Sequence, residues 1–317
     1  AVVEQPVINE EAGTIVFAVN EEVESLKFTP IIEISEGATI TPASGVAQDF
    51  SNNKKVTYTV TAEDGTVKVY TAFVEGTRKV LKYSFEDWKE GTKNDELLPK
   101  DLWAGSAAGA GILGGTLLRK ETREDGTYAA KLITFEYPNE PNSLVPKITA
   151  GSIFIGKFDM MPALQGDRLS CTKFGLDAET VSLGGKPLRF KGVYKYESGS
   201  NYLDASNYED VKPVDIKDKG QIQAVLYKVQ TGEDGKEIVL TGHDVNTSEL
   251  RVAVANIIVE DIKEYTPFNI EFEYLQEYDR TAKYKFAIIC SSSKDGDLFK
   301  GAGGSTLIVD EFEVICE

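Results

Sequence analysis

The glycine-rich run GAGGST, residues 301–306, is the first stretch that suggests chemistry, because glycine loops can cradle a phosphate. A phosphate loop of the GxxxxGK[ST] type carries its lysine after the glycines and leads into a helix whose N-terminus faces the phosphate. Here Lys300 precedes the glycines, and the following TLIVDEFEV (306–314) alternates as a strand. The run therefore predicts a flexible connection into a final strand and not a nucleotide site.

Aromatic residues beside amides and carboxylates form a second pattern, which is typical of sugar recognition. An aromatic face covers the apolar C–H face of a sugar ring, while neighbouring polar groups bind its hydroxyls. Such residues occur in LRFKGVYKY (188–196), in the long polar segment 196–220 and at the Gly/Ala-rich segment 103–115. The candidate carbohydrate-binding residues are Tyr194, Tyr196, Tyr202, Tyr208 and Trp103.

Each of these aromatic residues could instead belong to the hydrophobic core, and the sequence favours that alternative to different degrees. Tyr194 shares an alternating apolar face with Phe190, which favours the core. Tyr196 ends the same strand beside the polar segment, so a core role and a ligand role are equally consistent with it. Tyr202 and Tyr208 lie inside the polar segment, where aromatic residues are better ligand candidates.

A third pattern is a carboxylate inside an apolar strand. Strand alternation places Asp310 on the face of Ile308 and Phe312, which we expect to point inward. A buried carboxylate needs a partner, and Glu86 and Asp87 in SFEDW could add oxygens for a structural Ca²⁺. Equally consistent is that Asp310 accepts backbone N–H groups at a bulge. No other cofactor is expected.

Composition argues against several other chemistries. The formal net charge of −17 disfavours nucleic acid and anionic membrane surfaces. His243 is the one histidine, so we expect a turn residue and no His-based triad or multi-histidine metal site. Cys290 and Cys316 are expected to be buried thiols that could form a disulfide. The 51 acidic residues leave room for the carboxylate pair of a glycoside hydrolase, but no catalytic residue stands out.

In most of the segments that must position these residues, apolar and polar side chains alternate with a period of two residues. PFNIEFEY (267–274) and AKYKFAIIC (282–290) alternate apolar and polar residues, as half-buried strands do. Asp-Gly pairs at Gly65, Gly126 and Gly235 supply the positive φ that tight turns need. Long amphipathic helices are missing, so the chain is predicted to be all-β and built from sandwiches.

A domain boundary is predicted at GTRK, residues 76–79. Residues 1–78 have the length and the strands of a small Ig-like β-sandwich, which would act as a spacer. Residues 79–317 are consistent with one larger β-sandwich.

Four blocks of the larger domain carry a family resemblance. They are SFEDW (84–88), AGSIFIGKF (150–158), PLRFKGVYKYESG (187–199) and SSSKDGDLFKGAGGSTLIVDEFEV (291–314). In this order they resemble the putative carbohydrate metabolism domain family over about residues 80–317. The resemblance implies a jelly-roll β-sandwich similar to carbohydrate-binding modules, which often hold a structural Ca²⁺ near such first and last strands.

The smaller domain carries a resemblance of its own. TPASGVAQDFSNNKKVTYTVTAEDG (41–65) resembles the small Ig-like or cadherin-like domains of bacterial surface proteins. Together the two resemblances imply an exported protein at the cell surface or in the periplasm, lipid-anchored in its precursor as an outer membrane lipoprotein. Its partners would be a polysaccharide or host glycan and the proteins of a surface glycan-uptake system; no transmembrane segment is visible.

The function predicted from these observations is a non-catalytic glycan-binding module of a polysaccharide-utilisation system. Two alternatives stay open at this point. One is a glycoside hydrolase-like enzyme that uses a carboxylate pair, and the other is a structural or adhesive surface protein without a sugar ligand.

Overall fold

The computed structural model describes residues 1–142 and 145–317, and it is all-β apart from short helical turns. The chain forms two compact units. Unit 1 comprises Ala1–Val80 and Ile315–Glu317, and unit 2 comprises Leu81–Val314. No helix in the described part of the chain is long and apolar enough to cross a membrane.

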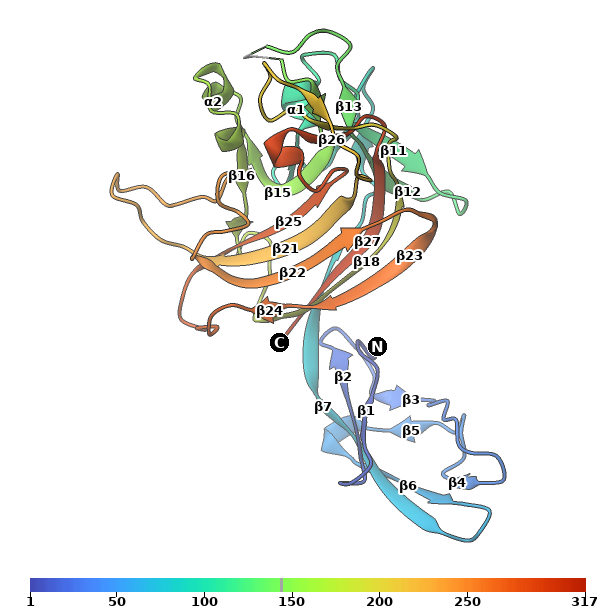
Figure 1. Ribbon diagram of the computed structural model, residues 1–317. Coiled ribbons are helices and arrows are strands. Elements are labelled where there is room, and N and C mark those ends of the chain that lie inside the picture. Colours follow the sequence, from blue (N-terminus) through green and yellow to red (C-terminus); the bar gives the residue numbers. More distant parts are fainter. Residues whose placement is uncertain (143–144) are drawn as a thin grey trace. The chain divides into compact units, whose positions relative to one another are not determined.

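Unit 1 is a small Ig-like β-sandwich (Figure 1). Strands β1, β2, β7, β6 and β4 lie side by side in that order, with β2 parallel to β7, and β3 pairs with β5. The elements are β1 (Val7–Asn9), β2 (Thr14–Asn20), β3 (Lys27–Phe28), β4 (Thr39–Thr41), β5 (Gln48–Asp49), η1 (Ser51–Asn53), β6 (Val56–Thr61) and β7 (Val67–Tyr83). The buried core residues are Phe17, Val19, Phe50, Tyr58 and Ala72.

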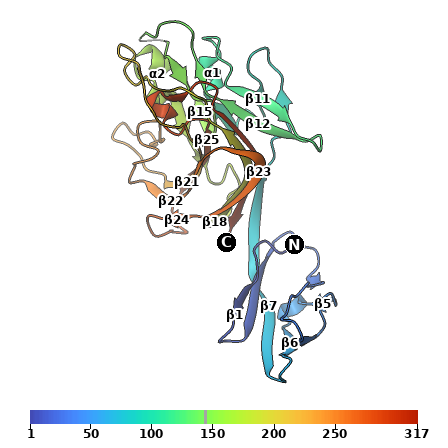
Figure 2. The same cartoon turned by 45° about the vertical axis from the view of Figure 1, so that its right-hand side comes forward.

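Unit 2 is a larger β-sandwich of the jelly-roll type, whose two main sheets are seen from two directions in Figures 1 and 2. In the first sheet, β11 pairs with β12, β12 with β27, β27 with β18, and β18 with β23. The bounds are β11 (Leu118–Thr122), β12 (Tyr128–Ile133), β27 (Thr306–Cys316), β18 (Pro187–Glu197) and β23 (Ile262–Glu271).

The second sheet of unit 2 carries the strands that matter for the site. Its order is β10, β15, β25, β21, β22 and β24, with β16 paired to β15 and β17 paired to β25. The bounds are β10 (Trp103–Gly105), β15 (Ser152–Phe158), β25 (Tyr284–Ser291), β21 (Gly220–Lys228), β22 (Arg251–Val259), β24 (Glu273–Tyr274), β16 (Thr172–Phe174) and β17 (Leu176–Asp177).

Short elements complete unit 2, and in both views α1 and α2 lie at one end of the sandwich. Strand β8 pairs with β9, β13 with β14, and β19 with both β20 and β26. The bounds are β8 (Trp88–Lys89), β9 (Glu96–Leu97), α1 (Ala107–Ala110), β13 (Phe135–Glu136), β14 (Ile148–Thr149), α2 (Met161–Leu164), η2 (Leu169–Cys171), β19 (Tyr202–Asp204), β20 (Lys212–Pro213), η3 (Gly296–Leu298) and β26 (Lys300–Ala302).

The core of unit 2 contains a cluster of edge-to-face aromatic rings. Phe312 lies 5.2 Å from Phe85, 5.0 Å from Phe190 and 5.7 Å from Phe268, measured between ring centroids. These separations and steep angles suit the quadrupoles of aromatic rings, which adds to the gain from burying their area. The cluster therefore packs β27 and β18 against Phe85, near the start of unit 2.

The three cysteines are buried and free. The expectation of buried thiols is confirmed for Cys290 and Cys316, and no disulfide joins them. Burial raises the pKa of both thiols, so each stays protonated and behaves as a small apolar side chain.

The final strand corrects one prediction. Val309 and Phe312 are both buried although they are three residues apart, so strict alternation breaks between them. Glu311, with φ of 55°, marks the extra residue of a bulge. Ile308 and Phe312 therefore do not share one inward face, and Asp310 becomes buried, 3% exposed, where the alternation changes phase.

The partner of Asp310 is Arg123, from the turn that joins β11 and β12. The Arg123 guanidinium pairs with the carboxylates of both Asp310 and Glu311, and it lies 4.6 Å from the ring centroid of Tyr265. The Glu311 amide donates to Asp310 Oδ1 at 2.7 Å. Burial raises the pKa of the Asp310 carboxyl, and Arg123 opposes that change.

We predict that Arg123→Met lowers the free energy of unfolding by about 3–5 kcal/mol at pH 7, because it leaves a buried carboxylate without its cation. Burial raises the folded-state pKa of Asp310 above its unfolded value, so folding would take up a proton once the cation is gone. The deficit should therefore shrink as pH falls from 7 to about 5. Urea unfolding at both pH values measures this.

The double variant Arg123→Met/Asp310→Asn is the matched control, because it removes the cation and the charge together. It should be more stable than Arg123→Met at pH 7 and should lack its pH dependence. A deficit in Arg123→Met that is the same at both pH values would contradict the assignment.

Candidate functional site

A pocket of about 210 Å³ opens at one end of unit 2. Its floor is the face of the second sheet formed by β15, β25 and β21. The strand register aligns Ser152, Ser291 and Gln221 in one row across the three strands. In the next row, Ile289 lies directly opposite Gln223. Because alternate residues of a strand share a face, both rows line the pocket.

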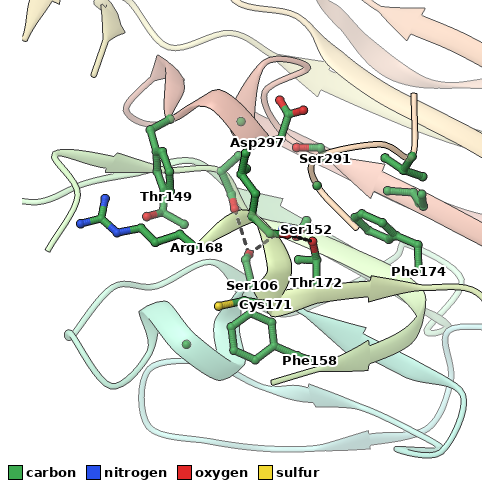
Figure 3. Close-up of a pocket in the computed structure, with 18 of the residues that line it drawn as sticks. Ser106, Thr149, Ser152, Phe158, Arg168, Cys171, Thr172, Phe174, Ser291 and Asp297 are labelled. Atoms are coloured by element: carbon green, nitrogen blue, oxygen red, sulfur yellow. Dashed lines mark hydrogen bonds between the residues drawn. The ribbon is translucent and has the colours of Figure 1, made fainter. Parts of the chain in front are cut away.

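The wall on the α1 side is fixed by a serine and a glycine. The Ser106 hydroxyl donates to the Ala150 carbonyl and accepts from the Ser152 amide, both at 2.9 Å. A Cβ on Gly109 would lie 2.6 Å from the Phe158 ring, so only glycine lets that ring pack here. Figure 3 shows Ser106 with its two hydrogen bonds, and Phe158 on this side of the pocket.

Part of the lining is apolar. Phe158, Phe174, Val245 and Ile289 all line the pocket. Phe174 is 7% exposed and packs edge-to-face on Phe154 at 4.8 Å, within the buried cluster that also includes Val245 and Ile289. Phe158 packs against this cluster, and Val245 reaches it from the turn at 241–246, so core packing fixes this part of the pocket.

The polar part of the lining contains amides, hydroxyls, the carboxyl of Asp297 and two cationic side chains, Arg168 and Lys294. Gln223 is 4% exposed, and its Nε2 donates to Asn246 Oδ1 at 3.3 Å. Gln221 Nε2 donates to Asn256 Oδ1 at 2.9 Å. On the η3 side, Asp297 lines the pocket (Figure 3), and burial raises the pKa of its carboxyl.

The η3 wall is tied down by a buried carboxylate, Asp218. Its Oδ2 accepts from Ser293 Oγ at 2.6 Å, Ala302 N at 2.8 Å and Ser305 Oγ at 2.7 Å. Ser293 precedes the segment 294–301 and Ala302 follows it, so one carboxylate holds both ends of the wall that carries Asp297. Burial raises the pKa of Asp218, and these donors oppose the shift.

The glycine run GAGGST belongs to this centre. A Cβ on Gly301 would lie 2.4 Å from Ser293 Oγ and 3.3 Å from Asp218 Oδ2. The run leads directly into β27, as predicted, but its glycine at 301 provides a close approach to Asp218 that the sequence interpretation missed. The signal that could have found it is the pairing of a serine run, SSS (291–293), with a glycine run ten residues later.

The predicted carbohydrate-binding aromatics are not gathered in one place. Within residues 1–142 and 145–317, none of Tyr194, Tyr196, Tyr202, Tyr208 and Trp103 lines the pocket. Tyr194 is half-buried beside Phe268, with 6.3 Å between ring centroids. Tyr208 is 39% exposed, so a role for its ring in stacking on a sugar stays a prediction.

Three of these rings are core residues in this structure. Tyr196 is 2% exposed and its hydroxyl donates to the Ser292 carbonyl at 3.0 Å. Tyr202 is 5% exposed and donates to Asp295 Oδ2 at 3.0 Å, because its segment forms β19 against β26 instead of an open loop. Trp103 packs on Phe85 at 5.5 Å. Rings enclosed in this way have no free face for a sugar.

The proposed calcium ligands do not converge. Asp310 is paired with Arg123, and the Glu86 carboxylate accepts from the Tyr128 amide at 3.2 Å. Asp87 is exposed. The part of the chain that the structure describes contains no group of three His, Cys, Asp or Glu side chains that could hold a metal ion. The donor set therefore does not fit the oxygen-rich shell that calcium requires.

His243 pairs with a carboxylate at the edge of the same region. Its Nε2 lies 2.7 Å from Asp167 Oδ1, and both side chains are about half exposed. The Gly242 amide donates to the Leu169 carbonyl at 3.0 Å, so two contacts join the turn at 241–246 to residues 167–169. His243 is the turn residue that the sequence predicted.

Comparison with known protein families shows which family the chain belongs to. The family model described as "putative carbohydrate metabolism domain" matches residues 53–315. The chain belongs to this family. A second model, described as the N-terminal domain of SGBP, matches residues 2–74. Both findings confirm the resemblances seen in the sequence. The second model describes the N-terminal domain of surface glycan-binding proteins.

Two solved structures are similar to this member of the putative carbohydrate metabolism domain family. A putative glycoside hydrolase from Bacteroides thetaiotaomicron is 30% identical with a TM-score of 0.64, covering 100% of this chain and 94% of its own. Another putative glycoside hydrolase, from Bacteroides vulgatus, is 27% identical with a TM-score of 0.61, covering 75% and 98%. No curated protein matches the chain significantly.

Carbohydrate-binding modules also appear among the similar structures. The CBM22-1 xylan-binding domain of Xyn10C from Paenibacillus barcinonensis is 12% identical, with a TM-score of 0.30, and the match covers 75% of this chain and 96% of that one. That similarity is too low to bear on what this chain binds.

We predict that Asp218→Ala lowers the free energy of unfolding by about 2–5 kcal/mol, because three buried donors lose their acceptor at once. The matched control is Asp215→Ala, an exposed aspartate in the same segment, which should change stability by less than about 0.5 kcal/mol. Urea unfolding of the full chain measures both. Equal stability of the two variants would show that Asp218 does not hold the wall.

Proposed function

We propose that this chain is a non-catalytic glycan-binding module of a bacterial surface or exported protein in a polysaccharide-utilisation system. The observation that carries the proposal is the pocket in unit 2, whose floor sets two rows of amide, hydroxyl and apolar side chains across β15, β25 and β21. Membership of a carbohydrate metabolism family supports it.

The chemistry of the lining suits a neutral sugar. Amides such as Gln221 and hydroxyls such as those of Ser152 and Ser291 can donate and accept, as sugar hydroxyls do. Phe158 and Phe174 offer apolar surface for C–H groups. A neutral sugar brings no charge to the Arg168, Lys294 and Asp297 side chains that also line the pocket, so affinity should depend weakly on salt.

We assign a different role to each of the two units. We assign residues 1–78 to an Ig-like spacer and residues 79–317 to the glycan-binding domain. The match of the N-terminal residues to the SGBP model supports a position at the cell surface, beside the proteins of a glycan-uptake system. A lipid anchor in the precursor and a host glycan as ligand are further parts of this proposal.

A glycoside hydrolase is the second candidate, and Asp297 is the observation that favours it. A carboxyl whose pKa is raised by burial in a pocket is suited to donate a proton to a leaving group. Hydrolysis also needs a second carboxyl about 5–10 Å away. Among the described residues that line the pocket, Asp297 is the single carboxyl, so binding is the better supported function.

The binding proposal is tested with a panel of plant, host and bacterial polysaccharides in affinity gels, followed by calorimetry on the best ligand. Gln223→Ala should weaken binding at least about fivefold, because it removes the buried amide of the floor. Glu264→Ala, an exposed change on β23, should leave affinity unchanged. If no polysaccharide retards the protein in the gel, the proposal is overturned. A strong loss of affinity in Tyr208→Ala would place the binding site at that ring instead of in the pocket.

The choice between module and enzyme is tested separately by incubating the full chain with the bound polysaccharide and measuring new reducing ends. We expect none above the buffer blank. If reducing ends form and Asp297→Asn abolishes them while still binding the polysaccharide, the hydrolase is the correct assignment.

A further inference from the structure

The pocket places an amide pair directly beside aliphatic side chains. Ile289 lies directly opposite Gln223 in the strand register, and Val245 immediately precedes Asn246 in the chain. All four side chains line the pocket. Each half of the Gln223–Asn246 amide pair therefore has a fixed apolar neighbour within the same wall.

The bond between the two amides leaves Gln223 Oε1 as an acceptor and Asn246 Nδ2 as a donor for a ligand. Gln223 Nε2 is used in the bond to Asn246 Oδ1, and within residues 1–142 and 145–317 no protein group bonds to Gln223 Oε1 or Asn246 Nδ2. If O and N are exchanged in both amides, the wall still presents one amide NH2 group and one amide carbonyl oxygen outside the bond between them. The wall thus offers a donor for a carbonyl and an acceptor for an N–H.

The adjoining apolar wall is costly for hydroxyls. A sugar hydroxyl placed against Ile289, Val245 or Phe174 would lose its hydrogen bonds to water without replacement. An alkyl group placed there would be stabilised by leaving water, by roughly 25 cal/mol for each Å² buried. The wall therefore selects a ligand with an alkyl group beside a carbonyl.

Exposed apolar residues adjoin the lining residues along the chain. Ile112 is 72% exposed, Met161 58%, Leu164 64% and Leu298 46%, and these residues flank or interrupt the lining segments of the α1, α2 and η3 walls. These side chains add exposed apolar surface next to lining residues along the chain.

We propose that the pocket recognises a sugar unit that carries a short acyl group, as an ester or an amide. The acyl carbonyl accepts from the amide pair, its alkyl end lies against Val245 and Ile289, and an N-acyl ligand also donates its N–H to the free amide acceptor. This inference rests on the proposed glycan-binding function and narrows its ligand class.

The test compares two neutral probe pairs that differ only in acylation, using calorimetry on the full chain. Chitohexaose and cellohexaose share a β-1,4 backbone and differ in the acetamido group. Native acetylated xylan and the same xylan after mild alkali differ in O-acetyl esters. We expect at least about tenfold tighter binding to the acylated member of one pair or both; the pair that responds separates the amide source from the ester source.

Asn246→Asp is the matching variant, because it replaces the amide with an isosteric acceptor at an exposed position. It should reduce binding of the preferred acylated probe at least about tenfold and reduce binding of the non-acylated member by a smaller factor. Asn207→Asp, an exposed change away from the lining, is the control and should alter neither.

Equal binding of acylated and non-acylated probes would overturn this inference while leaving glycan binding in place. So would an acyl preference that survives Asn246→Asp, or binding to neither acylated probe while another polysaccharide of the panel is retained. Retention of no polysaccharide at all would remove the proposed function together with this inference.

Discussion

The buried carboxylate of Asp218 is the interaction on which the site depends. A charge taken out of water is stable only when donors replace the lost solvent, and here two serine hydroxyls and a backbone amide do so at a single oxygen. Those donors come from both ends of the segment 294–301. Satisfying one charge therefore also sets the position of a pocket wall.

The floor and the η3 wall of the pocket are held in place by different interactions. Phe174 and Ile289 face the pocket but belong to a buried cluster, so their positions come from core packing. Asp297 and Phe299 line the pocket from a wall that is held at its ends by hydrogen bonds. A rigid floor with separately anchored walls presents a prearranged surface, which lowers the entropy lost when a flexible ligand binds.

The sequence predicted the elements better than the site. Alternation and the Asp-Gly turns indicated the all-β fold, and Gly65, Gly126 and Gly235 all have positive φ. Alternation failed at Asp310, because a bulge changes the phase of a strand without any residue type that announces it. Tyr202 is buried because distant segments pair as β19 and β26. Such long-range pairing, like the donors around Asp218, leaves no local period in the sequence.

The alternation of the floor strands has a consequence for how ligand preference can change. In β21, Gln221 and Gln223 face the pocket while Ile222 and Ala224, each 0% exposed, point into the sandwich. Replacing Gln221 or Gln223 would thus change ligand contacts without altering Ile222 or Ala224, whereas Val225 and Tyr227, on the same face of β21, belong to the buried core. Ligand preference could therefore change at two positions of one strand while the side chains between them keep their packing against the other sheet.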